Sequence, residues 1–146
     1  MAENKFYDYA TGKEVKSNPE EAYRQLFEHI LIDDLGYPKS HIDIEVVLQR
    51  GAKRNAEEVD IVVYNSDVHK QENAYIIIEI ETPKKKYDLQ AFSYVTATTA
   101  PYCVWFAGFD KNSEGPFYNY RDLATDPTKF MSIPTLPRYG DRKSTR

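Results

Sequence analysis

The sequence predicts an α/β domain in which a mixed β-sheet carries helices on its faces. Residues 75–81 read Tyr-Ile-Ile-Ile-Glu-Ile-Glu, an apolar run typical of a central strand that is covered on both sides. Residues 59–64 give a second apolar strand pattern, interrupted by the single acid Asp60. Helical patterns lie before and after these strands, over residues 19–35 and 87–98.

Size and composition suit one folded domain. The 146 residues are enough to bury a core, and the 29% charged and 14% aromatic residues are typical of a globular chain. The formal net charge is −4, whereas a domain that binds DNA on its own is usually basic. A nucleic-acid partner must therefore be bound locally, through a metal ion, or with help from other subunits.

Cysteine usage and hydropathy predict the cellular compartment of the protein. Cys103 is the sole cysteine and cannot form an internal disulfide, which suits a reducing cytoplasm. No apolar run reaches the roughly 18 residues of a membrane helix, and residues 1–16 do not resemble a signal peptide. We expect a cytoplasmic protein without a membrane partner.

The first helix is expected to run from Pro19 to about Leu35. Ser17 or Asn18 can cap it, Pro19 suits the first helical position, and Gly36 suits its end. The predicted apolar stripe contains Ala22, Leu26 and Ile30, widened by Tyr23, Phe27 and Leu31. Three polar residues follow one edge of that stripe at helical spacing: Glu21, Gln25 and Glu28.

The remaining strands follow from alternation of apolar residues. Apolar positions 42, 44, 46 and 48 predict a half-buried strand that forms a hairpin with residues 59–64. A strand over residues 102–109 is connected to residues 75–81 by the second helix, and residues 117–121 are expected to form the last, edge strand. We place the domain in residues 1–125, because residues 126–146 hold three prolines and a basic end, as in a linker or tail.

Acidic side chains end the central strand. Glu79 and Glu81 share one face of this strand, where two buried acids are costly unless a cation accompanies them. Hard divalent cations prefer oxygen ligands. We therefore predict that Asp60, Glu79 and Glu81 converge on one metal site.

Five short stretches carry a resemblance to a known family. They are Pro19-Glu-Glu-Ala-Tyr-Arg-Gln, Leu35-Gly-Tyr-Pro-Lys, Asp60-Ile-Val-Val-Tyr, Ile78-Glu-Ile-Glu and Gln90-Ala-Phe-Ser-Tyr94. Together they resemble the PD-(D/E)XK nuclease superfamily, and more narrowly the N-terminal nuclease domain of type I restriction enzyme R (HsdR) subunits. The likeness covers residues 19–109, most of the chain.

The resemblance implies a restriction-endonuclease-like fold and Mg²⁺-dependent cleavage of double-stranded DNA, with Mn²⁺ able to substitute. By the same resemblance, Asp60 and Glu79 would bind the metal ion, with the carbonyl of Ile80 as a further ligand. The implied catalytic residues are Asp60, Glu79, Glu81 and an acid of the first helix. Glu21 is the first choice for that acid and Glu28 the second.

The resemblance also implies DNA contacts and partners. Gln90 and Tyr94 match a glutamine and a tyrosine that contact DNA in this family, and Lys84 or Lys85 could meet a phosphate. The expected partners are double-stranded DNA and the methyltransferase and specificity subunits of a restriction complex. ATP is expected as a cofactor only if a motor domain follows in the full-length protein.

Glu81 departs from the family pattern, which usually has lysine at that position. A second metal ion could balance the added charge, Lys84 or Lys85 could reach back, or the domain could have lost catalysis. The alternative function is therefore a catalytically inactive nuclease-fold module for DNA docking or subunit assembly. A standalone protein with an unrelated binding role is a third possibility.

Overall fold

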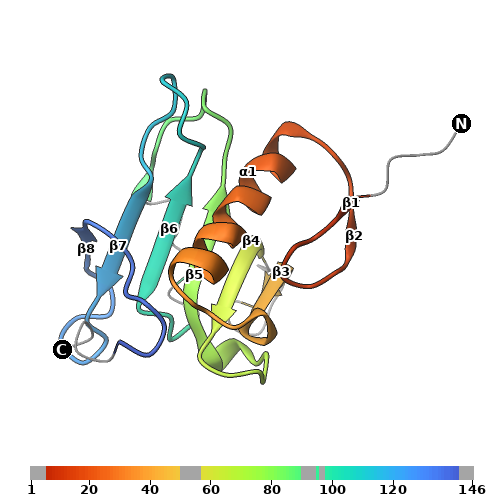
Figure 1. Cartoon of the computed structure of the whole chain (residues 1–146). Helices are drawn as coiled ribbons and strands as arrows, with labels where there is room; N and C mark the ends of the chain where they lie inside the picture. Colours follow the sequence, from red (N-terminus) through yellow and green to blue (C-terminus); the bar gives the residue numbers. More distant parts are fainter. Residues whose placement is uncertain (1–5, 50–56, 90–94, 96–97, 142–146) are drawn as a thin grey trace, which may run out of the picture.

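The computed structural model describes residues 6–49, 57–89, 95 and 98–141. In this part of the chain, six strands form the central sheet in the order β3-β4-β5-β6-β7-β8 (Figure 1). The strands are β3 (Ile42–Leu48), β4 (Glu57–Tyr64), β5 (Ala74–Ile80), β6 (Tyr102–Phe106), β7 (Phe117–Arg121) and β8 (Phe130–Ile133). β5 and β6 are parallel, whereas the other neighbours are antiparallel. This confirms the predicted α/β class with a mixed sheet, compatible with a restriction-endonuclease-like fold.

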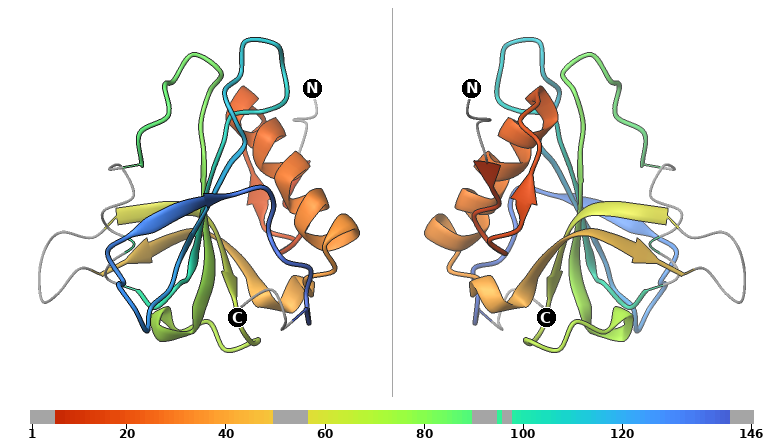
Figure 2. Two further views of the ribbon diagram at one scale, coloured as in Figure 1. Left: turned by 90° about the vertical axis from the view of Figure 1, so that its left-hand side faces the viewer. Right: turned by 90° about the vertical axis from the view of Figure 1, so that its right-hand side faces the viewer.

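The two faces of the sheet have separate cores. Helix α1 (Pro19–His29) and the small hairpin of β1 (Phe6–Tyr7) and β2 (Glu14–Val15) lie on one face (Figure 2). On the opposite face, Tyr87, Leu89 and Val95 pack in the second core. Among the described residues, no helix has the length and apolar character that crossing a membrane requires.

The ends of α1 confirm the sequence signals. The side chain of Asn18 accepts a hydrogen bond from the Glu21 backbone N–H at 2.7 Å, and Pro19 occupies the first turn. The helix continues as a π-helical turn over Ile30–Asp34, and the chain leaves it at Gly36 with φ +83°.

The predicted apolar stripe of α1 is confirmed for Tyr23, Phe27, Ile30 and Leu31 but is wrong for Ala22 and Leu26. Ala22 is exposed and Leu26 is 41% exposed. Phe27 and Leu31 are fully buried against the sheet, with Tyr23 packed beside them. The core-facing stripe is therefore turned from the predicted one, which brings the polar edge of the helix under the N-terminal hairpin.

The predicted single apolar face of β3 was also wrong. Ile42 and Ile44 pack in the core beneath α1, whereas Val46 and Leu48 pack in the core of the opposite face. Glu45 lies between these pairs with φ +53°, a left-handed conformation that breaks the simple alternation of an extended strand.

The second predicted helix lies mainly outside the described residues, but its predicted start is wrong. Tyr87 and Asp88 are not helical. The Tyr87 ring stacks on Phe117 with centroids 3.9 Å apart, and its hydroxyl accepts a hydrogen bond from Asn119 at 2.9 Å. These contacts with β7 hold the segment against the sheet where a helix was expected to begin.

Part of the expected C-terminal tail belongs to the sheet. β8 pairs antiparallel with β7, so β7 is not the edge strand. Leu136 is 2% exposed in the core beneath α1, and the Tyr37 hydroxyl donates to the Pro137 carbonyl at 2.7 Å. Pairing and burial of this segment therefore replace the linker interpretation for residues 130–137.

Candidate active site

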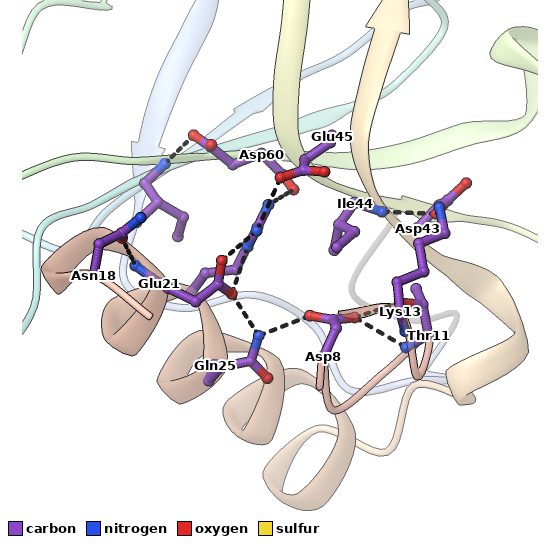
Figure 3. Close-up of polar contacts among 12 residues, drawn as sticks. Asp8, Thr11, Lys13, Asn18, Glu21, Gln25, Asp43, Ile44, Glu45 and Asp60 are labelled. Carbon is purple, nitrogen blue, oxygen red and sulfur yellow. Dashed lines mark hydrogen bonds and ion pairs between the residues drawn. The ribbon is translucent and has the colours of Figure 1, made fainter. Parts of the chain in front are cut away.

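Asp60 lies on β4 at the point where β4 and β5 cease to pair, and we call this point the fork. β4 pairs with β5 from Ile61 onward, whereas Val59 pairs with β3. At this fork, the Asp60 Oδ2 atom accepts a hydrogen bond from the Ile80 backbone N–H at 2.8 Å (Figure 3). The first residue of the predicted metal site is thus joined directly to the end of the central strand.

An acidic cleft of about 460 Å³ opens on the α1 side of the fork. Its lining comprises Glu14, Val15, Lys16, Asn18, Glu20, Glu21, Arg24, Glu45, Glu58, Asp60 and Ile80. The lining therefore holds six carboxylates and two cationic side chains, and carboxylate oxygens are ligands that hard divalent cations prefer.

A buried arginine connects the helix to the two strands. Arg24 is 5% exposed and forms a two-pronged ion pair with Glu21, which is also 5% exposed. Its Nη2 atom also lies 3.2 Å from Glu45 Oε2, and its Nη1 atom donates to the Asp60 carbonyl at 3.4 Å. Gln25 donates a further hydrogen bond to Glu21 at 2.7 Å. Glu21, the expected helix acid, is therefore held mainly by Arg24.

The surroundings of Asp60 disfavour its negative charge. Burial raises the pKa of Asp60 to about 6, and the charges of Glu20 and Glu81 contribute to the rise. The Ile80 N–H and the Arg24 charge oppose the shift. Burial also raises the pKa of Glu81, with a contribution from Glu20. A cation bound here would relieve the repulsion among these carboxylates.

Glu79 emerges on the other face of β5. Ile78 and Ile80 pack in the core beneath α1, so alternation directs Glu79 to the opposite face, in register with Trp105 of β6. Glu79 is not part of the lining of the cleft. The structure thus brings Asp60, Glu21 and Ile80 together, and a metal ion shared by Asp60 and Glu79 stays a prediction.

The predicted DNA contacts lie after the central strand. Lys84 and Lys85 are exposed, and the Lys85 charge opposes the rise in the pKa of Glu81. Gln90 and Tyr94 lie outside the described residues.

Glu28, the second-choice helix acid, belongs to a separate buried pair. It is 0% exposed, and its Oε1 atom accepts a hydrogen bond from the Ala10 N–H at 2.9 Å. Burial raises the pKa of Glu28 to about 9, and hydrogen bonding with Asp8 adds to the rise. Among the described atoms, Glu28 Oε2 has no hydrogen-bond partner, which fits a protonated and uncharged carboxyl group. Glu28 therefore fastens the hairpin to α1.

We expect the protein to lose stability as pH rises from about 5 to 9. Between the ordinary value of 4.5 and the folded pKa of about 9, Glu28 binds its proton only in the folded state. The free energy of unfolding then falls by up to about 1.4 kcal/mol per pH unit. Glu28→Gln keeps both hydrogen-bonding roles without a titrating proton and should flatten this slope in denaturant titrations. The exposed variant Glu72→Gln should keep the slope, and equal slopes in both variants would contradict the assignment.

One comparison with known proteins decides the family. The family model described as "Type I restriction enzyme R protein N terminus (HSDR_N)" matches residues 19–137, most of the 146-residue chain. The chain belongs to this family. No curated protein and no solved structure matched the chain. The match to the R-protein N terminus spans α1, the whole central sheet and Asp60, but not the β1–β2 hairpin.

The carboxylate oxygens of the cleft are donors of the kind that Mg²⁺ prefers, but the described side chains are not gathered into a complete metal site. They do not form a group of three His, Cys, Asp or Glu residues that could hold a metal ion. Mg²⁺ commonly keeps several waters and binds through one or two carboxylates, so one well-placed acid and a carbonyl are a sufficient start. In this member of the R-protein N-terminal family, Asp60 and Ile80 line the cleft side by side.

Sequence reasoning missed Arg24 and Glu45. The signal for Arg24 was its position three residues after Glu21 on the polar edge of the helix. The signal for Glu45 was the antiparallel hairpin, whose register places it opposite Asp60 between the pairs Ile44–Ile61 and Val46–Val59.

Proposed function

We propose that this chain is the nuclease region of a type I restriction R protein, with a PD-(D/E)XK-type site that hydrolyses phosphodiester bonds of double-stranded DNA. Asp60, half-buried at the fork of an acidic cleft, is the observation that carries the proposal. The family match supports a role in a restriction system.

The proposed cofactor is Mg²⁺, for which Mn²⁺ can substitute. Asp60 and the Ile80 carbonyl are the proposed ligands on the cleft side. Glu79, the other proposed ligand, would have to turn from the opposite face of β5 to reach the same ion. When bound, such an ion polarises a phosphoryl oxygen and lowers the pKa of a coordinated water. The raised pKa of Glu81 suits a proton acceptor for that water. Glu21 would act indirectly, by holding Arg24 beside the Asp60 backbone.

The proposed partners follow from the same role. Lys84, Lys85, Gln90 and Tyr94 are proposed to contact DNA after the central strand. The methyltransferase and specificity subunits of a restriction complex are the proposed protein partners, and ATP enters only if a motor domain follows.

A second candidate function is DNA docking or subunit assembly without catalysis. Glu81 stands where the superfamily usually has lysine, and Glu21 is occupied by Arg24 and Gln25. Both features remove groups that a nuclease of this type would use.

Cleavage of plasmid DNA by the complete restriction complex containing this chain separates the two candidates. We expect nicking or linearisation with Mg²⁺ or Mn²⁺ and none after chelation by EDTA. A complex that assembles and binds DNA but leaves the plasmid intact under Mn²⁺ would favour the docking function. Cleavage that persists in EDTA would contradict the proposed cofactor.

A further inference from the structure

We propose that Lys16 is a substrate-phosphate contact of this site, presented over the acidic cleft by the N-terminal hairpin. The inference rests on the proposed nuclease function. It assigns to the β1–β2 hairpin a part in DNA binding, although the hairpin precedes the family match, which begins at residue 19.

The charges in the cleft single out Lys16. Among the described residues that line the cleft, Lys16 and Arg24 are the two cations. Arg24 is buried and already shared by Glu21 and Glu45. Lys16 is exposed and, among the described residues, makes no ion pair. A phosphate that approaches Asp60 therefore meets one cation whose donors are not committed to the protein.

The backbone on either side of Lys16 is fixed. Val15, in β2, packs against the core beneath α1. Two residues after Lys16, the Asn18 side chain caps the helix. The lysine is thus held by its neighbours at the rim of the cleft, while its long flexible stem can adapt to the position of a phosphate.

The rest of the hairpin is fastened to the domain by specific contacts. The Tyr9 N–H donates to Gln25 Oε1 at 2.8 Å, and Gln25 Nε2 donates to Asp8 Oδ1 at 2.8 Å. Lys13 forms an ion pair of 2.8 Å with Asp43 of β3 (Figure 3). Because these contacts hold the hairpin against the domain and its end lines the cleft, the position of Lys16 is defined.

The salt dependence of DNA binding tests this role. Each phosphate that a protein cation neutralises contributes about 0.9 to the slope of log K against log salt. Lys16→Ala should therefore reduce the slope by about 1 and weaken binding at low salt on the order of tenfold. Lys16→Arg should keep both values near those of the unaltered protein. A purely structural role would change the melting temperature but not the slope.

Fluorescence anisotropy with a labelled DNA duplex, with Ca²⁺ in place of Mg²⁺ to limit hydrolysis, gives the slope for the full chain. Lys70→Ala is the control, because Lys70 is also exposed but lies in the turn before β5 and does not line the cleft. A loss of slope in Lys16→Ala that exceeds that in Lys70→Ala supports the proposal. Equal slopes in these two variants, or no DNA binding by the unaltered chain, overturn it.

A separate cleavage assay with Asp60→Asn keeps the two proposals distinguishable. If Asp60→Asn is inactive while Lys16→Ala and Lys70→Ala give equal slopes, the role of Lys16 fails and the nuclease function stands. If Asp60→Asn cleaves as well as the unaltered protein, the nuclease function itself fails.

Discussion

Replacing Glu21 with alanine is expected to lower the free energy of unfolding by about 3–5 kcal/mol. The substitution removes both carboxylate oxygens that hold Arg24, whose side chain is only 7% exposed. The guanidinium would remain in the interior with Glu45 as its carboxylate partner, at 3.2 Å. Urea denaturation followed by circular dichroism measures the change.

Two variants control for helix charge and packing. Glu20→Ala removes the neighbouring acid in the same first turn, and should cost less than about 1 kcal/mol because Glu20 is exposed. The double variant Glu21→Gln with Arg24→Met removes the ion pair as a whole and should recover much of the lost stability. If Glu21→Ala were as stable as Glu20→Ala, the Glu21–Arg24 ion pair would not stabilise the contact between α1 and β4 at Asp60.

Asp60→Asn is expected to reduce DNA cleavage by on the order of 10³-fold. A metal ion contributes several kcal/mol to the transition state, and each 1.36 kcal/mol is a factor of ten in rate. The asparagine oxygen can still accept the hydrogen bond from the Ile80 N–H, so the fold should survive. Single-turnover cleavage by the complete complex under saturating Mg²⁺ measures the effect.

Asp43→Asn is the matched control for this measurement. Asp43 lies on the adjacent strand β3, where it pairs with Lys13, and it is not part of the lining of the cleft. Its loss should leave the cleavage rate within about twofold, in line with the small contribution of an exposed ion pair. Similar rates for the two variants would count against a special role of Asp60.

Much of the fold could be predicted because local signals and tertiary packing agree. Asn18, Pro19 and Gly36 set the ends of the first helical segment as their backbone preferences require. The apolar run that ends at Ile80 forms a central strand because both of its faces are covered.

Apolar residues before and after Glu45 in β3 lie on opposite faces of the sheet, and alternation along the sequence could not predict this change. A period of two assumes an extended backbone throughout, and Glu45 leaves that region with φ +53°. Such a conformation is unfavourable for a residue other than glycine, so tertiary contacts must stabilise it. The ion pair with Arg24 is one such contact, and it comes from a helix that lies earlier in the chain.

The buried polar edge of α1 was hidden for a similar reason. Glu21, Arg24 and Glu28 carry charges that single-sequence reasoning assigns to solvent. Their burial depends on the hairpin, whose Ala10 N–H reaches Glu28, and on the strands that meet Arg24. These contacts join segments that are far apart in the sequence. The spacing of apolar residues within one segment therefore could not predict them.

The most direct test of the account is a crystal structure of the protein soaked with Mn²⁺, read by its anomalous signal. We expect an ion at about 2.1 Å from a carboxylate oxygen of Asp60, the short distance typical of a small divalent cation. The same signal should vanish in Asp60→Asn crystals. Mn²⁺ bound only elsewhere, or bound equally well in the Asp60→Asn protein, would contradict a metal-dependent site at the fork between β4 and β5.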